Sequence, residues 1–255
     1  MLASTVSALG RYVMLYGIYM LIIAVLMQPL ASFATQAKLD IAVGNTLPPY
    51  SIAEFESGIE VEIVRTALNN KGYSAEFFYV PFARLKSSLN SQLADAALTL
   101  KIDTADTDIF YSEPHVEFHN VVVTLAQSKI DIEAIDDLNS LSVLAFQNAT
   151  LNLGEEFAKM AKDNSRYTEI ANQESQVSML FLQRVDALVI DRRIFDYYHQ
   201  RMDPPLRATA LTFHDIFSPT NYHVGFTEEA IRDQFNDALR EMRLSGQYQK
   251  ILEKY

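Results

Sequence analysis

The sequence predicts an α/β fold for most of the chain. From residue 39 onward, strand-like apolar runs alternate with amphipathic stretches of helical periodicity, which is the pattern of an α/β architecture. The part after residue 34 has about 220 residues, and a chain of that size buries enough surface to fold without disulfides. The absence of cysteine is therefore compatible with a secreted domain.

The first predicted strand is 39–43, and it ends shortly before the double proline Pro48-Pro49. A helix is expected at 59–70, because its apolar residues recur four apart and Gly72 follows, as glycine commonly does just past a helix end. The next expected elements are a strand at 77–80, a helix at 82–90 and a strand at 94–98.

A continuous run of β-branched and apolar residues at 121–126 fits a fully buried strand. After an acidic linker, a second α/β unit is expected, with strands at 141–146 and 187–190 and helices at 153–161, 176–182 and 193–201, ended by Pro204-Pro205. A strand at 222–226 then precedes a long helix at 228–244 and a last helical segment at 248–255. The long helix carries one apolar face, made of Ile231, Phe235, Ala238, Leu239 and Met242.

Five strings in order resemble the family 3 solute-binding proteins, the extracytoplasmic receptors best known for capturing amino acids for ABC importers. They are L-D-I-A-V-G-N-T-L-P-P-Y-S from residue 39, P-F-A-R-L-K-S-S-L-N-S-Q-L-A-D-A-A-L (81–98), Y-S-E-P-H (111–115), L-Q-R-V-D-A-L-V-I-D (182–191) and G-Q-Y-Q-K-I-L-E-K-Y (246–255). The resemblance implies a two-lobed periplasmic binding protein of type II, with a ligand cleft between the lobes and a two-strand hinge. Lobe 1 is expected at 38–123 plus 225–255, and lobe 2 at 124–224.

The first 34 residues have the order of a cleaved signal peptide. A single charge, Arg11, precedes an apolar run at 13–27, and small residues end the segment at Ala34. The alternative is an uncleaved membrane anchor, but the run of about 15 residues is shorter than the roughly 20 that a spanning helix needs. We expect cleavage after Ala34 or Ala37, and delivery to the periplasm.

The net charge of the chain indicates which classes of binding partner are disfavoured. The chain has 21 Lys and Arg against 32 Asp and Glu, a net charge of −11. A surface of that sign repels phosphate backbones and anionic lipid, which argues against nucleic-acid or membrane-surface binding. We expect a monomer that binds a small molecule and that uses no cofactor.

Two candidate ligand residues stand at the carboxyl ends of predicted strands. Tyr50, aimed by the two prolines, could form a cleft wall that stacks on an apolar or cationic ligand part, or could cover the lobe surface. Asp191 ends the strand A-L-V-I. The resemblance implies that its carboxylate binds the ammonium group of the ligand. The alternative role is to cap the following helix, and the two roles are compatible with each other.

The sequence departs from the family between Thr99 and Ser112. Relatives carry an arginine there that clamps the ligand's α-carboxylate, and Ala105 takes its place. Thr99 and Lys101 remain candidate ligand-binding residues in this segment, although the ammonium group of lysine cannot hold a carboxylate through two parallel hydrogen bonds as a guanidinium group does. This departure disfavours a free α-amino acid as the ligand.

The same segment contains Asp103, Asp106 and Asp108. They are expected to form a solvated acidic loop in which Asp103 caps a short helix. The alternatives are a loop that favours a cationic ligand and a calcium site, although the glycine and terminal glutamate of an EF-hand are missing.

The remaining candidates are Arg84, Thr150 and His115. Arg84 could line the cleft floor or pair with surface acids. Thr150 precedes a helix where relatives place backbone N–H groups and a hydroxyl for an anionic group, so it either contacts the ligand or caps that helix. His115 could approach the cleft. With Glu117 and His119 it could instead form a zinc site on one strand face, but isolated polar positions on a wet face are commoner, and we expect no metal.

The predicted function is capture of a small polar ligand, amino-acid-like or cationic, by hinge closure for an ABC permease or a membrane sensor. One alternative is a periplasmic enzyme on the same fold, similar to the cyclohexadienyl dehydratases, with Asp191, Glu113 or Asp103 as acid or base. Another is a degenerate receptor whose partner is a protein. The chain has no cysteine nucleophile, no G-x-S-x-G elbow and no P-loop, so we expect a protein that is not an enzyme.

Overall fold

The computed structural model describes residues 36–255, and the predicted leader at 1–34 lies outside them. The strands are β1 (Ala37–Gly44), β2 (Tyr73–Val80), β3 (Ala96–Leu100), β4 (Phe110–Tyr111), β5 (Val116–Phe118), β6 (Asn120–Leu125), β7 (Val143–Phe146), β8 (Tyr167–Ile170), β9 (Ala187–Asp191), β10 (Leu211–His214) and β11 (Thr220–Phe226). The α-helices are α2 (Ile59–Asn70), α3 (Leu85–Asn90), α4 (Ala149–Asn152), α5 (Glu155–Asp163), α6 (Gln173–Phe181), α7 (Arg192–His199), α8 (Pro204–Arg207), α9 (Glu229–Leu244) and α10 (Gln247–Lys254). Short 3-10 turns lie at η1 (Ala53–Phe55), η2 (Phe82–Arg84), η3 (Ala126–Ser128) and η4 (Ile135–Ser140).

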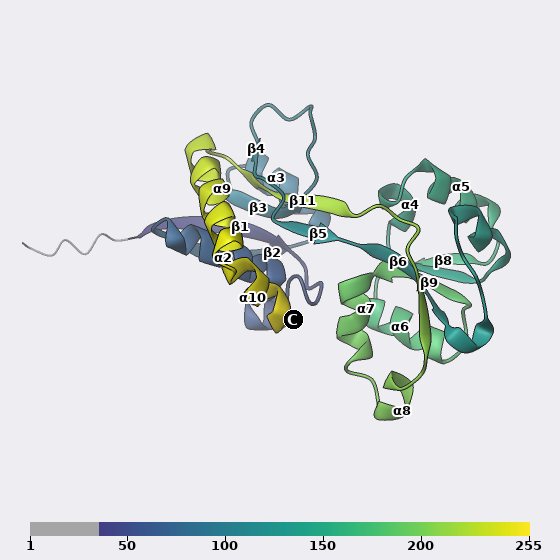
Figure 1. The fold of residues 1–255 in the computed structure, drawn as a ribbon. Coiled ribbons are helices and arrows are strands. Elements are labelled where there is room, and N and C mark those ends of the chain that lie inside the picture. The colour runs from purple at the N-terminus through teal and green to yellow at the C-terminus, as the bar shows by residue number, and fades with distance from the viewer. Residues whose placement is uncertain (1–35) are drawn as a thin grey trace, which may run out of the picture. The chain divides into compact units, whose positions relative to one another are not determined.

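Two mixed sheets organise these elements (Figure 1). The first has the strand order β2-β1-β3-β11-β4, with β5 also paired to β11, and the second has the order β10-β6-β9-β7-β8. In each sheet a parallel set (β1 with β2 and β3, β7 with β8 and β9) is extended by an antiparallel strand. The predicted α/β class is confirmed, because helices connect the parallel strands of both sheets.

The chain passes twice between the two sheets. The first passage is at His119, because β5 pairs with β11 of the first sheet whereas β6 pairs with β9 of the second. The second passage lies between β10 and β11. We therefore take lobe 1 as 37–118 plus 220–255 and lobe 2 as 120–214. The lobe boundaries predicted from the sequence, at 123 and 225, fall inside β6 and β11. An apolar run predicts a buried strand but does not indicate which sheet the strand belongs to.

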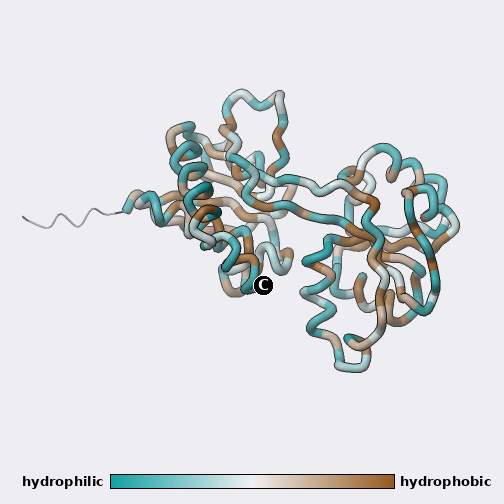
Figure 2. Tube along the Cα trace, viewed as in Figure 1, coloured by the Kyte–Doolittle hydropathy of each residue, from teal (hydrophilic) through white to brown (hydrophobic). Residues whose placement is uncertain are grey.

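The helix faces predicted for lobe 1 are confirmed. The five apolar residues predicted for α9 are buried, and Phe235 packs against Phe226 of β11 with ring centroids 5.3 Å apart. Gly72 follows α2 with φ of 84°, the left-handed conformation that suits glycine after a helix. Figure 2 shows the complementary pattern, with hydrophilic residues along the outer sides of the lobe 1 helices.

Several short elements were not predicted. Strands β4, β5, β8 and β10 have four residues or fewer and polar or mixed composition, so they give no periodic signal over a useful window. Pro204-Pro205, predicted only as the end of a helix, also begins helix α8, since proline suits a first helical turn. Strand β3 lies two residues further along the chain than the predicted 94–98.

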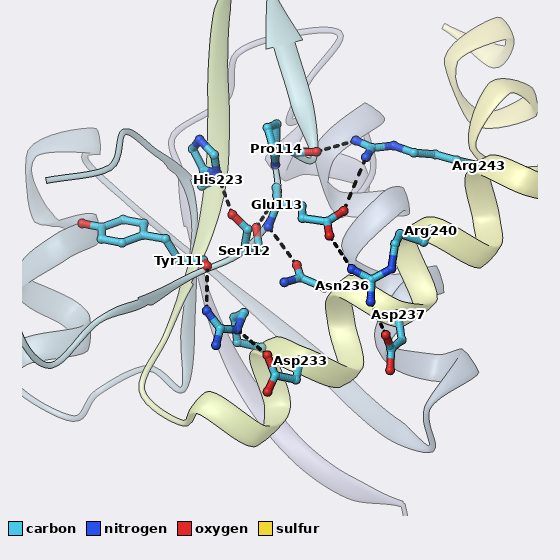
Figure 3. Close-up of polar contacts among 11 residues, drawn as sticks. Tyr111, Ser112, Glu113, Pro114, His223, Asp233, Asn236, Asp237, Arg240 and Arg243 are labelled. Atoms are coloured by element: carbon cyan, nitrogen blue, oxygen red, sulfur yellow. Dashed lines mark hydrogen bonds and ion pairs between the residues drawn. The ribbon is translucent and has the colours of Figure 1, made fainter. Parts of the chain in front are cut away.

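The segment from Tyr111 to Pro114 is tied to α9 by polar contacts (Figure 3). The backbone N–H of Glu113 donates to Asn236 Oδ1 at 2.8 Å, and the Glu113 carboxylate pairs with Arg240. Arg243 donates to the carbonyl of Pro114. These contacts fix the start of β5, the strand that leads to the passage between the sheets.

Among residues 36–255, no helix is both long and apolar enough to cross a membrane.

Candidate functional site

A cleft of about 660 Å³ is lined by residues from both lobes. Lobe 1 contributes the loop after β1, the end of β3, the start of β11 and the turn η2. Lobe 2 contributes the loop after β7, the start of α6 and the end of β9. In each lobe several of these are the carboxyl ends of parallel strands, where open α/β sheets bind ligands. Of the predicted residues, Thr99, Lys101 and Asp191 line this cleft.

Asp191 lies at the end of β9 and is 3% exposed. Its carboxylate accepts hydrogen bonds from the backbone N–H of Ile194 at 3.1 Å and of His119 at 2.8 Å. The first of these caps α7, so the predicted capping role is confirmed. The hydroxyl of Tyr50 donates to both carboxylate oxygens at 3.1 Å, which joins lobe 1 to lobe 2 at this point.

Burial raises the pKa of Asp191 to about 6, although the hydrogen bonds from Ile194, His119 and Tyr50 oppose the shift. The reference value is 3.8, so between pH 4 and 6 the folded protein holds a proton that the unfolded chain has lost. The free energy of unfolding contributed by this group therefore falls as the pH rises through that window.

We expect Asp191→Asn to remove this dependence. Relative to wild type, the variant should gain roughly 3 kcal/mol of unfolding free energy on going from pH 4 to pH 7, because raising a carboxyl pKa from 3.8 to about 6 corresponds to an energy of that order. Urea unfolding of both proteins at several pH values measures the difference. Asp136→Asn, at an exposed position, serves as the control. If the difference in unfolding free energy between wild type and Asp191→Asn does not change with pH, the raised pKa inferred for the buried Asp191 is contradicted.

Tyr50 does not line this cleft, although it lines a second cavity of about 710 Å³ together with Asp191. Tyr50 is 2% exposed and stacks behind Phe118, with ring centroids 3.8 Å apart and planes at 20°. Phe118 is the ring that lines the cleft, together with Phe82, Phe146 and Tyr222. The sequence reasoning missed these rings, although Phe82 stands in the string P-F-A-R-L.

Thr99 is held by a buried network in lobe 1. It has a φ of 59°, uncommon for a β-branched residue, and its hydroxyl donates to Glu60 Oε2 at 2.6 Å. Glu60 also meets His115 Nε2 at 3.2 Å, and His115 Nδ1 lies 3.0 Å from the carbonyl of Tyr222. His115 is fully buried, so it supports the cleft from behind and does not line it.

The zinc alternative has no support in the described part of the chain. Glu117 is exposed on β5 whereas His115 is buried, and His119 instead pairs with Asp215 at 2.8 Å. Within residues 36–255 no group of three histidine, aspartate or glutamate side chains is placed to hold a metal ion.

The charged lining of the cleft consists of Asp191 and Lys101. Lys101 Nζ donates to Asn152 Oδ1 of lobe 2 at 3.2 Å and lies 5.8 Å from the centre of the Tyr222 ring, and burial lowers its pKa. Arg84 is exposed and lies outside the lining. Among residues 36–255, no arginine lines this cleft.

The acidic loop does not reach the cleft lining. Asp103 and Asp106 both pair with Lys86, at 2.7 and 2.6 Å, and Asp103 also accepts from the backbone N–H of Ala105 at 3.0 Å. The hydrogen bond with Lys86 lowers the pKa of Asp103. These contacts leave no basis for a role of this loop in the charge that a ligand meets, which was one of the alternatives drawn from the sequence. The loop is largely exposed, as predicted, but no helix forms between β3 and β4, so the prediction that Asp103 caps a short helix is wrong.

Thr150 lies inside α4, after the loop that follows β7. The N-cap residues are Asn148 for α4 and Gly154 for α5, so the prediction that Thr150 caps the following helix is wrong. Its backbone N–H donates to Glu169 Oε1 at 3.0 Å, so the N–H is already occupied by a side chain of lobe 2. The neighbouring residues Gln147, Asn148 and Asn152 line the cleft, as does Gln173 at the start of α6. The side-chain Oε1 of Gln173 is buried without a hydrogen-bond partner among the described residues, which leaves an acceptor at the cleft wall.

Comparison with known proteins gives one family. The model of the bacterial extracellular solute-binding proteins, family 3, matches residues 39–255. A probable histidine-binding protein of Neisseria gonorrhoeae is 25% identical over 207 residues, covering 78% of this chain and 74% of the relative. The arginine-binding periplasmic protein of Mannheimia haemolytica is 22% identical over 236 residues, covering 86% of this chain and 92% of the relative.

The fold is shared with solved structures. An ancestral arginine-binding protein bound to arginine aligns with a TM-score of 0.66 and 21% identity, covering 87% of this chain and 99% of that one. A histidine kinase sensor domain with similarity to periplasmic binding proteins aligns with a TM-score of 0.67 and 16% identity, covering 87% and 96%. At these identities the structural likeness establishes the two-lobed fold and not the ligand.

Proposed function

This chain belongs to the bacterial extracellular solute-binding proteins, family 3, and we propose that its cleft captures a small organic cation. The observation that carries the proposal is Asp191, a buried carboxylate in a cleft whose lining also includes the rings of Phe118, Phe82 and Tyr222. A carboxylate and aromatic faces both attract an ammonium or guanidinium group. The relatives named as a probable histidine-binding and an arginine-binding protein are named for amino acids with basic side chains, which is consistent with this class.

Lys101 does not oppose this assignment. Its ammonium is directed to Asn152 of lobe 2 and to the face of the Tyr222 ring of lobe 1, and not to Asp191. A ligand with its cationic group at Asp191 and a neutral acceptor at its other end satisfies both residues. An arginine fork for a carboxylate is missing from the described lining.

Hinge closure is the mechanism that we propose for this capture. The lining comes from both lobes, and the lobes are joined by the two passages at His119 and before Thr220. A ligand that contacts both lobes binds the closed form better, and its binding free energy then shifts the equilibrium toward closure. The closed form is what an ABC permease or a membrane sensor would recognise. The predicted leader would deliver the protein to the periplasm as a monomer.

The enzyme alternative has less support than binding. Of the acids that could serve it, Asp191 lines the cleft, whereas Glu113 pairs with Arg240 and Asp103 pairs with Lys86 outside the lining. A single carboxylate held by a helix cap and a tyrosine hydroxyl fits ligand binding better than acid and base catalysis.

Thermal unfolding with a panel of amines, guanidines, quaternary ammonium compounds, amino acids and organic acids tests the proposal. We expect an organic cation to give the largest rise in Tm, since a ligand that binds the folded state stabilises it by mass action. That ligand should also reduce the radius of gyration in solution scattering. An organic acid as the best ligand would refute the proposed ligand class, and an unchanged radius at saturation would refute hinge closure.

A further inference from the structure

We infer that Glu169 makes this cleft select ligands that lack an α-carboxylate, an inference that rests on the proposed function. Glu169 belongs to β8, which runs parallel to β7 with Glu169 opposite Ala145. This register places its side chain beside the loop that leaves β7. Sequence reasoning alone did not single out this residue.

Both carboxylate oxygens of Glu169 are engaged. Oε2 accepts from the backbone N–H of Asn148 at 2.7 Å, and Oε1 accepts from the backbone N–H of Thr150 at 3.0 Å and from the Tyr167 hydroxyl at 2.8 Å. Both N–H groups belong to the segment 147–150, where the family resemblance places backbone N–H groups and a hydroxyl for an anionic part of the ligand. In this chain a carboxylate of the protein itself already takes them.

The charge of Glu169 adds to this occupation. Burial raises its pKa, but hydrogen bonds from Thr150, Tyr167 and Asn148 outweigh that effect and hold the pKa below its usual range. Glu169 is therefore ionised at neutral pH, next to Asn148 at the cleft wall. A ligand carboxylate entering there would meet a like charge and would find both N–H groups already bonded.

Lobe 1 offers no strong replacement for these N–H groups as a binding site for a ligand carboxylate. Ala105 stands where relatives carry the clamping arginine, and no arginine lines the cleft within residues 36–255. Lys101 provides one point charge without fork geometry. Each lobe therefore disfavours a ligand carboxylate for its own reason, whereas Asp191 can still bind the cationic group of a ligand. The favoured ligand class is an amine or guanidine without an α-carboxylate.

The test compares matched pairs that differ only in the carboxylate: agmatine with arginine, and histamine with histidine. Calorimetry on the secreted wild-type protein should show the amine binding at least about tenfold more tightly than its amino acid, a difference of roughly 1.4 kcal/mol. In Glu169→Ala this ratio should fall at least about tenfold, mainly because the amino acid binds more tightly. Glu156→Gln, an exposed glutamate of the same lobe, should keep the wild-type ratio.

A second measurement does not depend on the ligand. In NMR spectra of the wild type, the backbone amide signals of Asn148 and Thr150 should shift as the Glu169 carboxylate is protonated, at a pH below the usual pKa range of glutamate. Glu169→Gln should abolish this pH-dependent shift. Absence of that titration, or an unchanged amine preference in a folded Glu169→Ala, would overturn the role of Glu169 and leave cation binding intact. A wild type that binds organic acids and no cation would overturn the proposed function and, with it, this inference.

Discussion

Asp191→Asn should weaken binding of the cationic ligand by at least about thirtyfold. Removing one partner of a desolvated charge pair costs roughly 2 to 5 kcal/mol, because the ligand's charge then lies buried without a counter-charge. Asparagine keeps the size of the side chain and can still cap α7 through Oδ1, so the variant should fold. Calorimetry at pH 7.5 measures the loss.

The pH dependence gives an independent check on the same residue. With a pKa of about 6 in the free protein, Asp191 is ionised at neutral pH and becomes protonated below pH 6. A bound cation favours the ionised form, so affinity should fall up to about tenfold per unit as the pH drops below 6. Asp186→Asn is the matched control, because Asp186 bonds Ser142 outside the cleft lining. Submicromolar binding of a simple amino acid that is unaffected by Asp191→Asn would contradict the assignment.

Gly58→Ala should destabilise the protein on the order of 4 kcal/mol. Gly58 precedes α2 with φ of 119°, and a Cβ there would lie 2.4 Å from the backbone carbonyl oxygen of Tyr50. Backbone strain of this kind costs roughly 1 to 3 kcal/mol, and the clash adds to it because a backbone atom has to move. Moving Tyr50 would also disturb its hydrogen bonds to Asp191, so ligand affinity should fall as well.

Gly72→Ala is a control for the strain alone. Gly72 also has a positive φ, of 84°, but a Cβ there would meet no atom within 4 Å. Chemical unfolding should therefore show a clearly smaller loss for Gly72→Ala than for Gly58→Ala, and Gly72→Ala should leave ligand affinity unchanged. Equal losses in the two variants would show that the contact with Tyr50 contributes nothing.

The sequence by itself determined the α/β class, the two-lobed family fold and the long helices. Periodic patterns are local properties of the chain, so the buried face of α9 and the glycine after α2 could be predicted from spacing alone. Asp191 could be predicted because it ends a strongly apolar strand, and the carboxyl ends of such strands meet at the ligand cleft.

The tertiary structure decided which side chains line the cleft and which support it. Tyr50 and Phe118 are equally aromatic in the sequence, but their stacking order depends on how the first loop packs against β5, and that order places Phe118 at the cleft. The pairing of Asp103 with Lys86 and of Glu169 with Asn148 also joins residues far apart in the chain. Such contacts follow from strand register and loop packing, for which a single sequence carries no periodic signal. The charge that a ligand meets in this cleft is therefore a property of the folded chain and not of any one motif.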